Sequence, residues 1–520
     1  MQRSAGASEP PHLAPARRVA VMWDRLFAHH AQPNLNLQGQ IRAMMVAAIL
    51  DGQIPAGVSL PSSRALADRL GVARNTVVLA YEQLVAEGFL VTRQRSGYFV
   101  NPVILGGRVP LASTEQTAGR RDTSARPGPR WHARFRFQPS AQRNIVKPQK
   151  WQRYPYPFLY GQFDPTLFPT RAWRACCSKA LSVVDIRSWA PDLIVHDDAM
   201  LIEQIRTRVL PRRGVFAAAD EIVITVGAQH ALYLIADLLV AADTRIGVED
   251  PCYPDARNIL RARTNQVRSI AVDRHGLPVT DTLRDLDYVL VTPSHQCPTT
   301  VTMPLSRRQA LLEASAAYDF VVIEDDYETE NSFGGAPTPA LKSLDYDDRV
   351  IYIGSLSKTF APGLRVGYIV APATVIAELR GLRRLMLRHP SAFVQRAFGL
   401  FLSMGHYDAL IGRLSQEYHK RALAMADGLQ KYLPECGARA LTGGSSCWVQ
   451  GPPGLDTERL AVAAEQLGVL IEPGAVFFGS DNPPRHYFRL GFSAICVESI
   501  EPGLHALATA LERLHQLRDA

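Results

Sequence analysis

The stretch SLSKTFAPGLRVGY, residues 355–368, follows a short apolar run that predicts a buried strand. It opens with Ser355 and Ser357, continues with Lys358, and reaches Arg365 after an APG turn. Hydroxyls can donate to phosphate oxygens, and a guanidinium can bind two such oxygens at once. The lysine amine can then form a Schiff base with an aldehyde. The alternative is a solvated surface lysine beside a structural loop.

A carboxylate precedes this stretch in the segment FVVIEDDYETE, residues 320–330. Phe320 to Ile323 predict a second buried strand, and Asp325 and Tyr327 follow its end. Ligands of open parallel sheets bind beyond the carboxyl ends of the strands, so we expect these side chains near Lys358. A phosphate-binding set, a Schiff-base lysine and a carboxylate for a pyridine nitrogen together indicate pyridoxal 5′-phosphate (PLP).

SLSKTFAPGLRVGY and IEDDY resemble the aminotransferase-like domain of the MocR/GabR family of bacterial regulators. The resemblance implies an α/β domain of the type I PLP-dependent aminotransferase kind over residues 151–520. It also implies that Lys358 carries PLP and that Asp325 and Tyr327 contact the PLP ring.

Further cofactor contacts are expected from two other segments. A strand predicted over residues 222–226 leads into a helix opened by Gly227, Ala228 and Gln229, whose backbone amides can bind the phosphate. In VEDPCYPDARNIL, Tyr253 matches a family tyrosine near the cofactor or effector.

Two more segments supply candidates whose structural alternatives stay open. His295 and Gln296, in PSHQCPTT, could reach the cofactor ring oxygen, or could be loop residues bonded to the backbone. Arg489, in HYFRLGFS, matches the arginine that binds the substrate carboxylate in aminotransferase-like folds. The alternative for Arg489 is a surface or ion-paired arginine.

Residues 34–101 predict a separate α+β domain, a winged helix-turn-helix. Apolar residues at helical spacing give a first helix that ends at Asp51-Gly52. Two short helices separated by Gly71 follow, and LVTRQRSGYFV predicts a two-stranded hairpin. The second helix of such a pair enters the major groove with its amino-terminal end.

Arg74, Asn75 and Thr76 stand at that end and can bind base edges or phosphates. LPSSRALADRLGVARNTV resembles the GntR-type DNA-binding domain. That resemblance implies that Arg64, Arg74, Thr76 and the wing glycine Gly97 contact double-stranded operator DNA. The alternative is a winged helix that serves only for protein interaction.

Length and charge indicate how the domains are joined. The chain has 520 residues, more than one core can hold, and a net charge of +8. Residues 101–150 contain ten Lys/Arg and two Asp/Glu and are rich in Gly, Pro and Ser. We therefore expect a mobile tail over residues 1–33, in which VMWDRLF, residues 21–27, could form a helical turn. We also expect a basic, flexible linker over residues 102–150. The linker charge either serves solubility or adds phosphate contacts.

Composition indicates a soluble protein of the cytoplasm. No apolar run reaches the roughly 18 residues of a membrane span, and the amino terminus has no signal core. Seven cysteines without a CxxC pair predict neither a disulfide framework nor a metal site.

The family resemblance implies a transcriptional regulator that acts as a head-to-tail homodimer. A small amino compound would displace Lys358 to form an external aldimine with PLP, and its acid group would pair with Arg489. The dimer would then bind its operator differently. Two alternatives remain, namely a working aminotransferase with a DNA-binding domain and a sensor of PLP itself. Within this family GABA, taurine, ectoine-derived diamino acids and vitamin B6 are sensed, and the effector here stays open among them.

Overall fold

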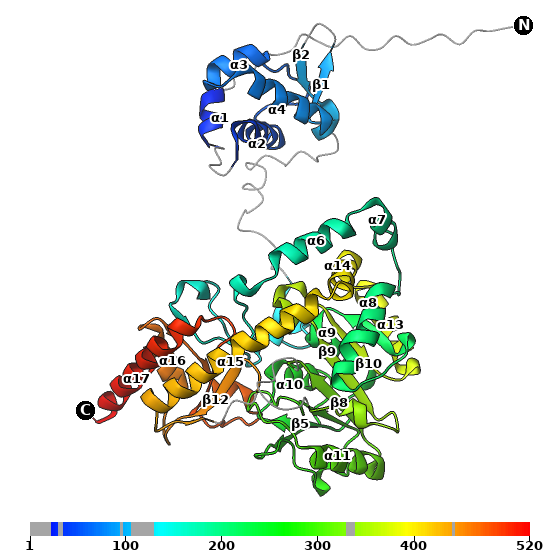
Figure 1. Ribbon diagram of the computed structural model, residues 1–520, viewed down its shortest axis with the longest axis vertical. Helices are drawn as coiled ribbons and strands as arrows, with labels where there is room; N and C mark the ends of the chain where they lie inside the picture. The colour runs from blue at the N-terminus through cyan, green and yellow to red at the C-terminus, as the bar shows by residue number, and fades with distance from the viewer. Residues whose placement is uncertain are drawn as a thin grey trace, which may run out of the picture. The chain divides into compact units, whose positions relative to one another are not determined.

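The computed structural model divides the chain into two units, with the boundary between Arg134 and Phe135 (Figure 1). It describes residues 22–29, 35–93, 97–105, 129–328, 338–438 and 443–519. Most of the predicted tail and linker, and residues 94–96 of the predicted hairpin, lie outside these ranges. No helix within them is both long and apolar enough to cross a membrane.

The first unit is the predicted winged helix-turn-helix. Asn36 and Ser62 cap the first turns of its second and third helices with their side-chain oxygens. Gly71, at φ 66°, ends the third helix, and the fourth begins three residues later. Leu90 and Val100 face each other in the antiparallel hairpin. The elements are α1 (Trp23–His29), α2 (Leu37–Leu50), α3 (Ser63–Leu70), α4 (Arg74–Ala86), β1 (Leu90–Arg93) and β2 (Gly97–Val100).

Helix α1 lies within the part of the chain that we expected to be a mobile tail. Trp23 is buried, and Leu26 and Phe27 pack against the same core as α2 and α3. These apolar side chains recur at helical spacing, so their burial stabilises the helix. The tail therefore does not extend over residues 23–29.

The second unit is built on a seven-stranded sheet. Neighbouring strands are parallel except for one, which runs antiparallel to both of its neighbours. In spatial order the strands are β4 (Ile222–Thr225), the antiparallel β10 (Gly367–Val370), β9 (Val350–Ser355), β8 (Val321–Asp326), β7 (Tyr288–Val291), β5 (Ile246–Asp250) and β6 (Val267–Ala271).

Helices cover both faces of this sheet because its strands are apolar on both sides. In β9, Ile351 and Ile353 pack into one core, whereas Val350 and Tyr352 face the other side. The first core holds α9 (Gly227–Leu239), α10 (Pro254–Arg261) and α13 (Ala373–Leu387). The opposite face holds α8 (Ala199–Gln204), α11 (Leu305–Tyr318) and α14 (Ala392–Ser403).

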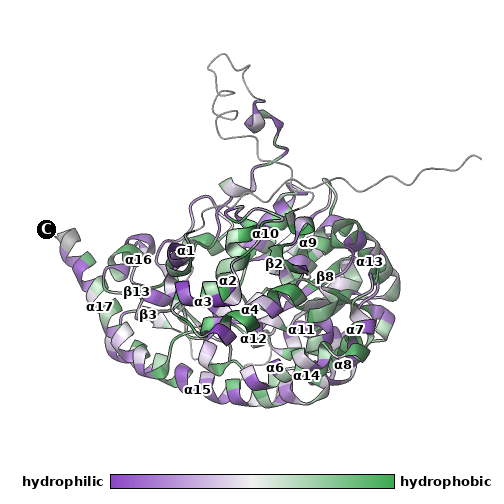
Figure 2. Ribbon diagram, turned by 90° about the horizontal axis from the view of Figure 1, so that it is seen from above, coloured by the Kyte–Doolittle hydropathy of each residue, from purple (hydrophilic) through white to green (hydrophobic). Residues whose placement is uncertain are grey.

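A smaller, four-stranded antiparallel sheet forms the carboxyl-terminal part of this unit. Its strands are, in spatial order, β11 (Gly437–Ala438), β12 (Ser446–Gln450), β15 (Tyr487–Gly491) and β14 (Glu472–Pro473). Two-residue strands β3 (Tyr156–Pro157) and β13 (Val469–Leu470) pair nearby. The remaining helices are α6 (Thr170–Ala180), α7 (Val183–Trp189), α12 (Ser357–Phe360), α15 (His406–Tyr432), α16 (Thr457–Glu465) and α17 (Val497–Asp519). Figure 2 shows hydrophilic and hydrophobic residues alternating along α15 and α17, as expected for helices with one buried side.

Residues 135–150, which we assigned to the linker, belong to the second unit. The Arg143 guanidinium donates to the carbonyls of Phe478 at 3.2 Å and Ser480 at 2.9 Å. Ile145 packs against an apolar cluster at the small sheet. Arg143, one of the basic residues of this stretch, therefore binds carbonyl oxygens of the second unit, and the linker ends earlier than predicted.

Strand β8 is longer than the predicted strand, Phe320 to Ile323. Asp325 and Asp326 belong to it because their backbones pair with Ile353 and Gly354 of β9. The Asp326 carboxylate accepts hydrogen bonds from Arg213 at 2.9 Å and from the Tyr352 hydroxyl at 2.8 Å. Asp326 is thus a structural carboxylate, and Asp325 points elsewhere.

Gly367 in β10 lies where three backbone segments converge. A Cβ at this position would lie 2.8 Å from the Gly227 carbonyl carbon and 3.0 Å from the Gly354 oxygen. Real Cβ atoms do not approach backbone this closely, so the sheet tolerates no side chain here.

We expect Gly367→Ala to lower the free energy of unfolding of the second unit by about 2 kcal/mol or more, since neither backbone can retreat without breaking strand pairing. Gly381→Ala is the control, because Gly381 is exposed in α13 and its Cβ would meet no atom. It should raise stability by about 0.5–1 kcal/mol. Urea unfolding followed by circular dichroism measures both, and two similar small effects would contradict the prediction.

Candidate functional site

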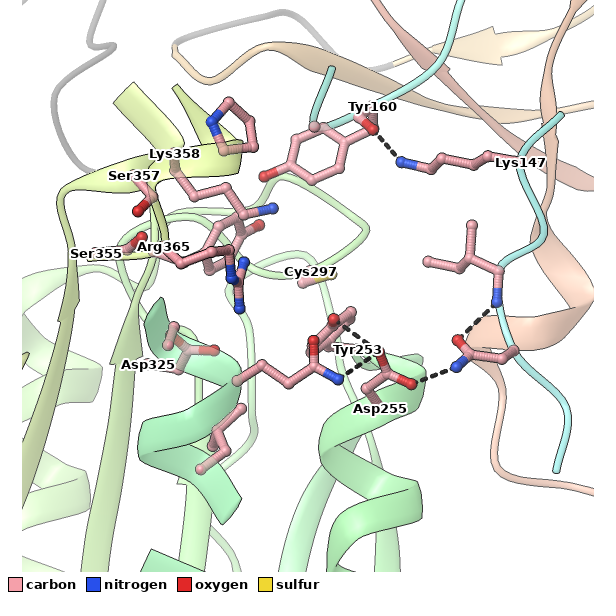
Figure 3. Close-up of a pocket in the computed structure, with 18 of the residues that line it drawn as sticks. Lys147, Tyr160, Tyr253, Asp255, Cys297, Asp325, Ser355, Ser357, Lys358 and Arg365 are labelled. Carbon is pink, nitrogen blue, oxygen red and sulfur yellow. Dashed lines mark hydrogen bonds between the residues drawn. The ribbon is translucent and has the colours of Figure 1, made fainter. Parts of the chain in front are cut away.

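The ends of β8 and β9 border a cavity of about 300 Å³ (Figure 3). This volume lies at the small end of the range for small-molecule sites. The other walls come from the first turns of α9 and α10, from β15 and from two segments before α6. The predicted site residues that line the cavity are Ala228, Gln229, Tyr253, Asp325, Tyr327, Ser355, Ser357, Lys358, Arg365 and Arg489.

Lys358 projects into this cavity from α12, the short helix that follows β9. Among the described residues its Nζ makes no hydrogen bond or ion pair. The Nζ lies 4.5 Å from the centre of the Tyr160 ring and 5.8 Å from that of Tyr327. Removal from bulk water lowers the pKa of Lys358, although Glu328 opposes this, and the neighbouring cations Lys147 and Arg489 lower it further. A larger share of the amine is therefore neutral and nucleophilic.

Asp325 is buried at the end of β8, and its Oδ1 has no hydrogen-bond partner in the described residues. Desolvation raises its pKa to about 7, although Lys358 lowers that pKa, and the carboxylates Asp326 and Glu249 raise it further. A buried carboxylate without a partner costs stability unless a cation or hydrogen-bond donor meets it. This group is therefore placed to receive a positively charged or protonated nitrogen.

Arg365 and the amino terminus of α9 form an anion-binding corner. Arg365 has a left-handed backbone, φ 53°, and its Nη2 donates to the Val226 carbonyl at 3.1 Å. The guanidinium fits there because Gly227 has no side chain: a Cβ would lie 3.0 Å from Nη2. The amides of Ala228 and Gln229 are in the first turn, where helices have no internal acceptors. The Arg365 guanidinium and these backbone amides are together suited to bind a phosphate.

Ser355 and Ser357 differ in what their hydroxyls can still do. The Ser357 hydroxyl donates to the Val366 carbonyl at 3.0 Å and accepts the Val366 N–H. Its one proton is therefore used to close the turn between Lys358 and Arg365. Ser355 is half-buried at the end of β9 and lines the cavity. The Ser357 hydroxyl is thus bonded within the turn, whereas the Ser355 hydroxyl faces the cavity and makes no hydrogen bond within the described residues.

Tyr253 and Tyr327 bring phenol rings to the cavity. Tyr253 donates to Asp255 at 2.9 Å, and Gln229 donates to the same carboxylate oxygen at 3.1 Å. Burial raises the pKa of both tyrosines, so their hydroxyls stay protonated. Both rings can contact a flat ligand. The Tyr327 hydroxyl can also donate to it, whereas the proton of Tyr253 is already donated to Asp255.

His295, Gln296 and Gly227 are predicted site residues that do not line the cavity. The Gln296 amide donates to the carbonyls of Pro251 and Cys297, each at 2.8 Å. Gln296 is therefore a loop residue bonded to the backbone, which was the structural alternative. His295 is buried beside Tyr327, with its Nε2 3.7 Å from Glu328. Gly227 lies beneath the Arg365 guanidinium.

Arg489 is ion-paired and also faces the cavity. Its Nε donates to Glu472 at 2.7 Å, and both side chains are buried. Its guanidinium carbon lies 4.2 Å from the centre of the Tyr160 ring and 4.6 Å from that of Phe477. Because Glu472 takes only the Nε–H, the two terminal nitrogens can still bind an acid group. Arg489 is therefore ion-paired through its Nε, as the structural alternative proposed. Its two terminal nitrogens remain available for the predicted binding of a carboxylate.

Several cavity residues were not predicted from the sequence. Asp255 follows Tyr253 by two residues and could have been found from the same motif. Pro362 and Cys297 stand in motifs that were quoted from the sequence but were not singled out there, whereas Asn144, Ile145 and Lys147 lie in the stretch that we assigned to the linker. Burial raises the pKa of the Cys297 thiol to about 11, which keeps it protonated and unreactive. The unpredicted residues are Asn144, Ile145, Lys147, Tyr160, Gly161, Leu232, Asp255, Cys297 and Pro362.

In the first unit, the residues predicted to contact DNA lie on α3, on α4 and at the start of β2. Arg74 and Asn75 are exposed in the first turn of α4, where Thr76 is half-buried. Arg64 is exposed on α3, and Gly97 begins β2 with φ 92°. Neither arginine makes a hydrogen bond or ion pair in the described residues. Their side chains are therefore available to bases or phosphates.

The donor set of the cavity fits PLP. The unpartnered Asp325 carboxylate suits the pyridine nitrogen, and Arg365 with the α9 amides suits the phosphate. The unbonded Lys358 amine suits the aldehyde. No group of His, Cys, Asp and Glu side chains that could hold a metal ion occurs in the described ranges.

Two family models match the chain. Residues 37–100 match the bacterial regulatory proteins of the gntR family, and residues 200–507 match the aminotransferases of class I and II. The two matched ranges fall in different structural units.

Known proteins resemble the chain over most of its length. The HTH-type transcriptional regulator TauR of Rhodobacter capsulatus is 42% identical over 92% of this chain and 96% of its own. The probable rhizopine catabolism regulatory protein MocR of Rhizobium meliloti is 29% identical over 91% and 93%. The crystal structure of LysN, an α-aminoadipate aminotransferase of Thermus thermophilus, matches with a TM-score of 0.67 at 26% identity, over 74% of this chain and 99% of that one.

We expect Asp325→Asn to stabilise the ligand-free protein in a pH-dependent way. The folded-state pKa of Asp325 is raised, so its destabilising effect is absent near pH 4, grows as the pH rises, and is complete above about pH 7. The gain from Asn should follow that course and reach on the order of 3 kcal/mol. Thermal unfolding of both proteins between pH 5 and 8 measures it, and a gain that shrinks with rising pH would refute the argument.

Proposed function

Since this chain belongs to the MocR-type bacterial regulators, which join a GntR winged helix to an aminotransferase class I and II domain, we propose that it regulates transcription in response to a small amino compound, with PLP as its cofactor. The observation that supports this most is one cavity bordered by an unbonded amine, Lys358, and an unpartnered buried carboxylate, Asp325.

Each wall of the cavity would hold one part of the cofactor. Asp325 would receive the ring nitrogen, and Tyr253 and Tyr327 would contact the ring. Ser355, Arg365 and the amides of Ala228 and Gln229 would bind the phosphate. When bound, PLP supplies an aldehyde carbon that condenses reversibly with primary amines.

An effector with a primary amine would compete with Lys358 for that carbon. The lowered pKa of Lys358 would favour this exchange. A neutral lysine amine can be displaced into the cavity and can react again without the cost of removing a charge from water. The free terminal nitrogens of Arg489 would bind the effector's acid group. The effector then acts on DNA binding only through a difference in its affinity for two arrangements of the regulator.

We further propose a head-to-tail homodimer in the cytoplasm that binds double-stranded operator DNA. Residues 35–100 contain six arginines and four acidic residues, which makes one winged helix a weak electrostatic partner for DNA. Two winged helices on two half-sites would supply the missing affinity.

An aminotransferase that carries a DNA-binding unit is the alternative, favoured by the similarity to LysN. It would require Lys358 to move a proton at the substrate carbon as well. Release of a keto acid from a primary-amine ligand over repeated turnovers would support this alternative. A cofactor spectrum that responds to no amine would instead indicate a sensor of PLP itself.

Lys358→Ala should abolish the absorption band that borohydride removes from the PLP-loaded protein, together with the covalent mass increase at residue 358, because the other amine that lines the cavity, Lys147, is held by Glu472 and the Tyr160 carbonyl. Circular dichroism should be unchanged. Lys179→Ala, at an exposed position of α6, should keep the band. An adduct that persists in the Lys358 variant would refute the assignment.

Arg74→Ala should weaken binding to a duplex selected from a random library with the full chain by roughly 10- to 100-fold, the value of a lost base contact. The cofactor band should not change. Arg25→Ala removes an equal charge from the exposed side of α1 and should have little effect. Fluorescence anisotropy measures all three proteins, and equal affinity of the wild type and the Arg74 variant would count against α4 as the recognition helix.

A further inference from the structure

One wall of the cavity is made by a short segment, residues 143–147, which we call the strap. The strap begins eight residues after Phe135, the first residue of the second unit. Its residues Asn144, Ile145 and Lys147 line the cavity. Figure 3 shows the Lys147 side chain directed toward Tyr160.

The strap is bonded to the second unit on several sides. Arg143 donates to two carbonyls after β14, and its own carbonyl accepts from Asn258 of α10 at 3.0 Å. Asn144 donates to Asp255, the carboxylate that also accepts from Tyr253. These bonds hold the strap against α10, which borders the cavity, and against the segment that follows β14. Its position therefore depends on how these two segments are arranged.

Lys147 and Arg489 share one buried carboxylate, that of Glu472. The Lys147 Nζ lies 3.2 Å from Oε1, and the Arg489 Nε lies 2.7 Å from Oε2. Lys147 also donates to the Tyr160 carbonyl. Two cations with one carboxylate leave a net charge of +1 at this end of the cavity. Arg489 and Glu472 are buried and Lys147 is partly exposed. The excess positive charge at this end of the cavity attracts an anion.

The same end lies close to the amine that would react with the effector. A Cβ on Gly161 would be 3.4 Å from the Lys358 Nζ and 3.9 Å from the Lys147 Nζ. The Tyr160 ring is 4.5 Å from Lys358 and 4.2 Å from the Arg489 guanidinium carbon. A small molecule that bears a primary amine near Lys358 would therefore bring an acid group, a few bonds away, to Lys147 and Arg489.

We propose that Lys147 is the second cation of an acid-binding subsite, so that the segment leading from the DNA-binding unit contacts the effector's acid group directly. The subsite would take a small amino acid with a carboxylate or sulfonate. Arg489 would bind the acid through its terminal nitrogens, and Lys147 would donate to it while keeping its place beside Glu472. This inference rests on the proposed function, because the effector is defined there as a primary amine.

The test compares amines with and without an acid group on the PLP-loaded full chain. The probes are 3-aminopropanoate, 4-aminobutanoate and 2-aminoethanesulfonate, with n-propylamine and n-butylamine as acid-free counterparts. The readout is the change in cofactor absorbance with probe concentration. In Lys147→Gln, the preference for acid-bearing probes should fall by roughly 10- to 100-fold, as expected for a lost charged hydrogen bond. The response to the two alkylamines should stay within twofold.

Two further variants separate this role from a merely structural one. Lys147→Arg keeps the charge and should retain most of the acid preference. Lys150→Gln removes a charge from an exposed position three residues on and should leave all titrations unchanged. An acid preference that survives in Lys147→Gln, or an equal loss for alkylamines, would overturn the inference. A wild-type protein whose spectrum responds to none of the probes would instead overturn the proposed function.

Discussion

The second unit depends on two charged groups that share a cavity without meeting. Asp325 and Lys358 would each be satisfied by an ion pair, and the structure forms none between them. Parallel pairing of β8 and β9 fixes their backbones and keeps the two side chains apart. Asp325 is buried, and burying a carboxylate without a partner is unfavourable by several kcal/mol, which the packing on both faces of the sheet must offset. The unsatisfied bonding capacity is what a cofactor with a ring nitrogen and an aldehyde would fill.

The parts of the site that the sequence predicted are those whose geometry is local. Lys358 and Arg365 follow one strand, and Asp325 lies at the end of the neighbouring apolar strand. Because ligands of parallel sheets bind at the carboxyl ends of the strands, the sequence predicts that these residues lie close together. Ser357 shows the limit of such reasoning. Its hydroxyl lies beside the cavity as expected but donates to the Val366 carbonyl. The sequence does not indicate which acceptor a serine hydroxyl will bind.

Other parts could not be predicted because distant segments create them. Lys147 and Arg489 are paired through Glu472, and Lys147 lies far along the chain from both of these partners. Helix α1 was underestimated for a similar reason, since Trp23 gains its burial from α2 and α3. In Arg489 the sequence motif and the ion pair had been treated as alternatives, whereas a guanidinium has enough donors to serve both.

The docking of residues 135–150 has a practical consequence for exchanging DNA-binding units among such regulators. A chimera joined at residue 150, where the composition of the basic stretch suggests a natural seam, would lose Arg143, Asn144 and Lys147 and open one side of the cavity. A junction before Phe135 keeps the whole second unit, with every residue that lines the cavity. The boundary between the two units is therefore set by the hydrogen bonds that residues 135–150 make with the second unit. Composition alone would place this boundary at residue 150.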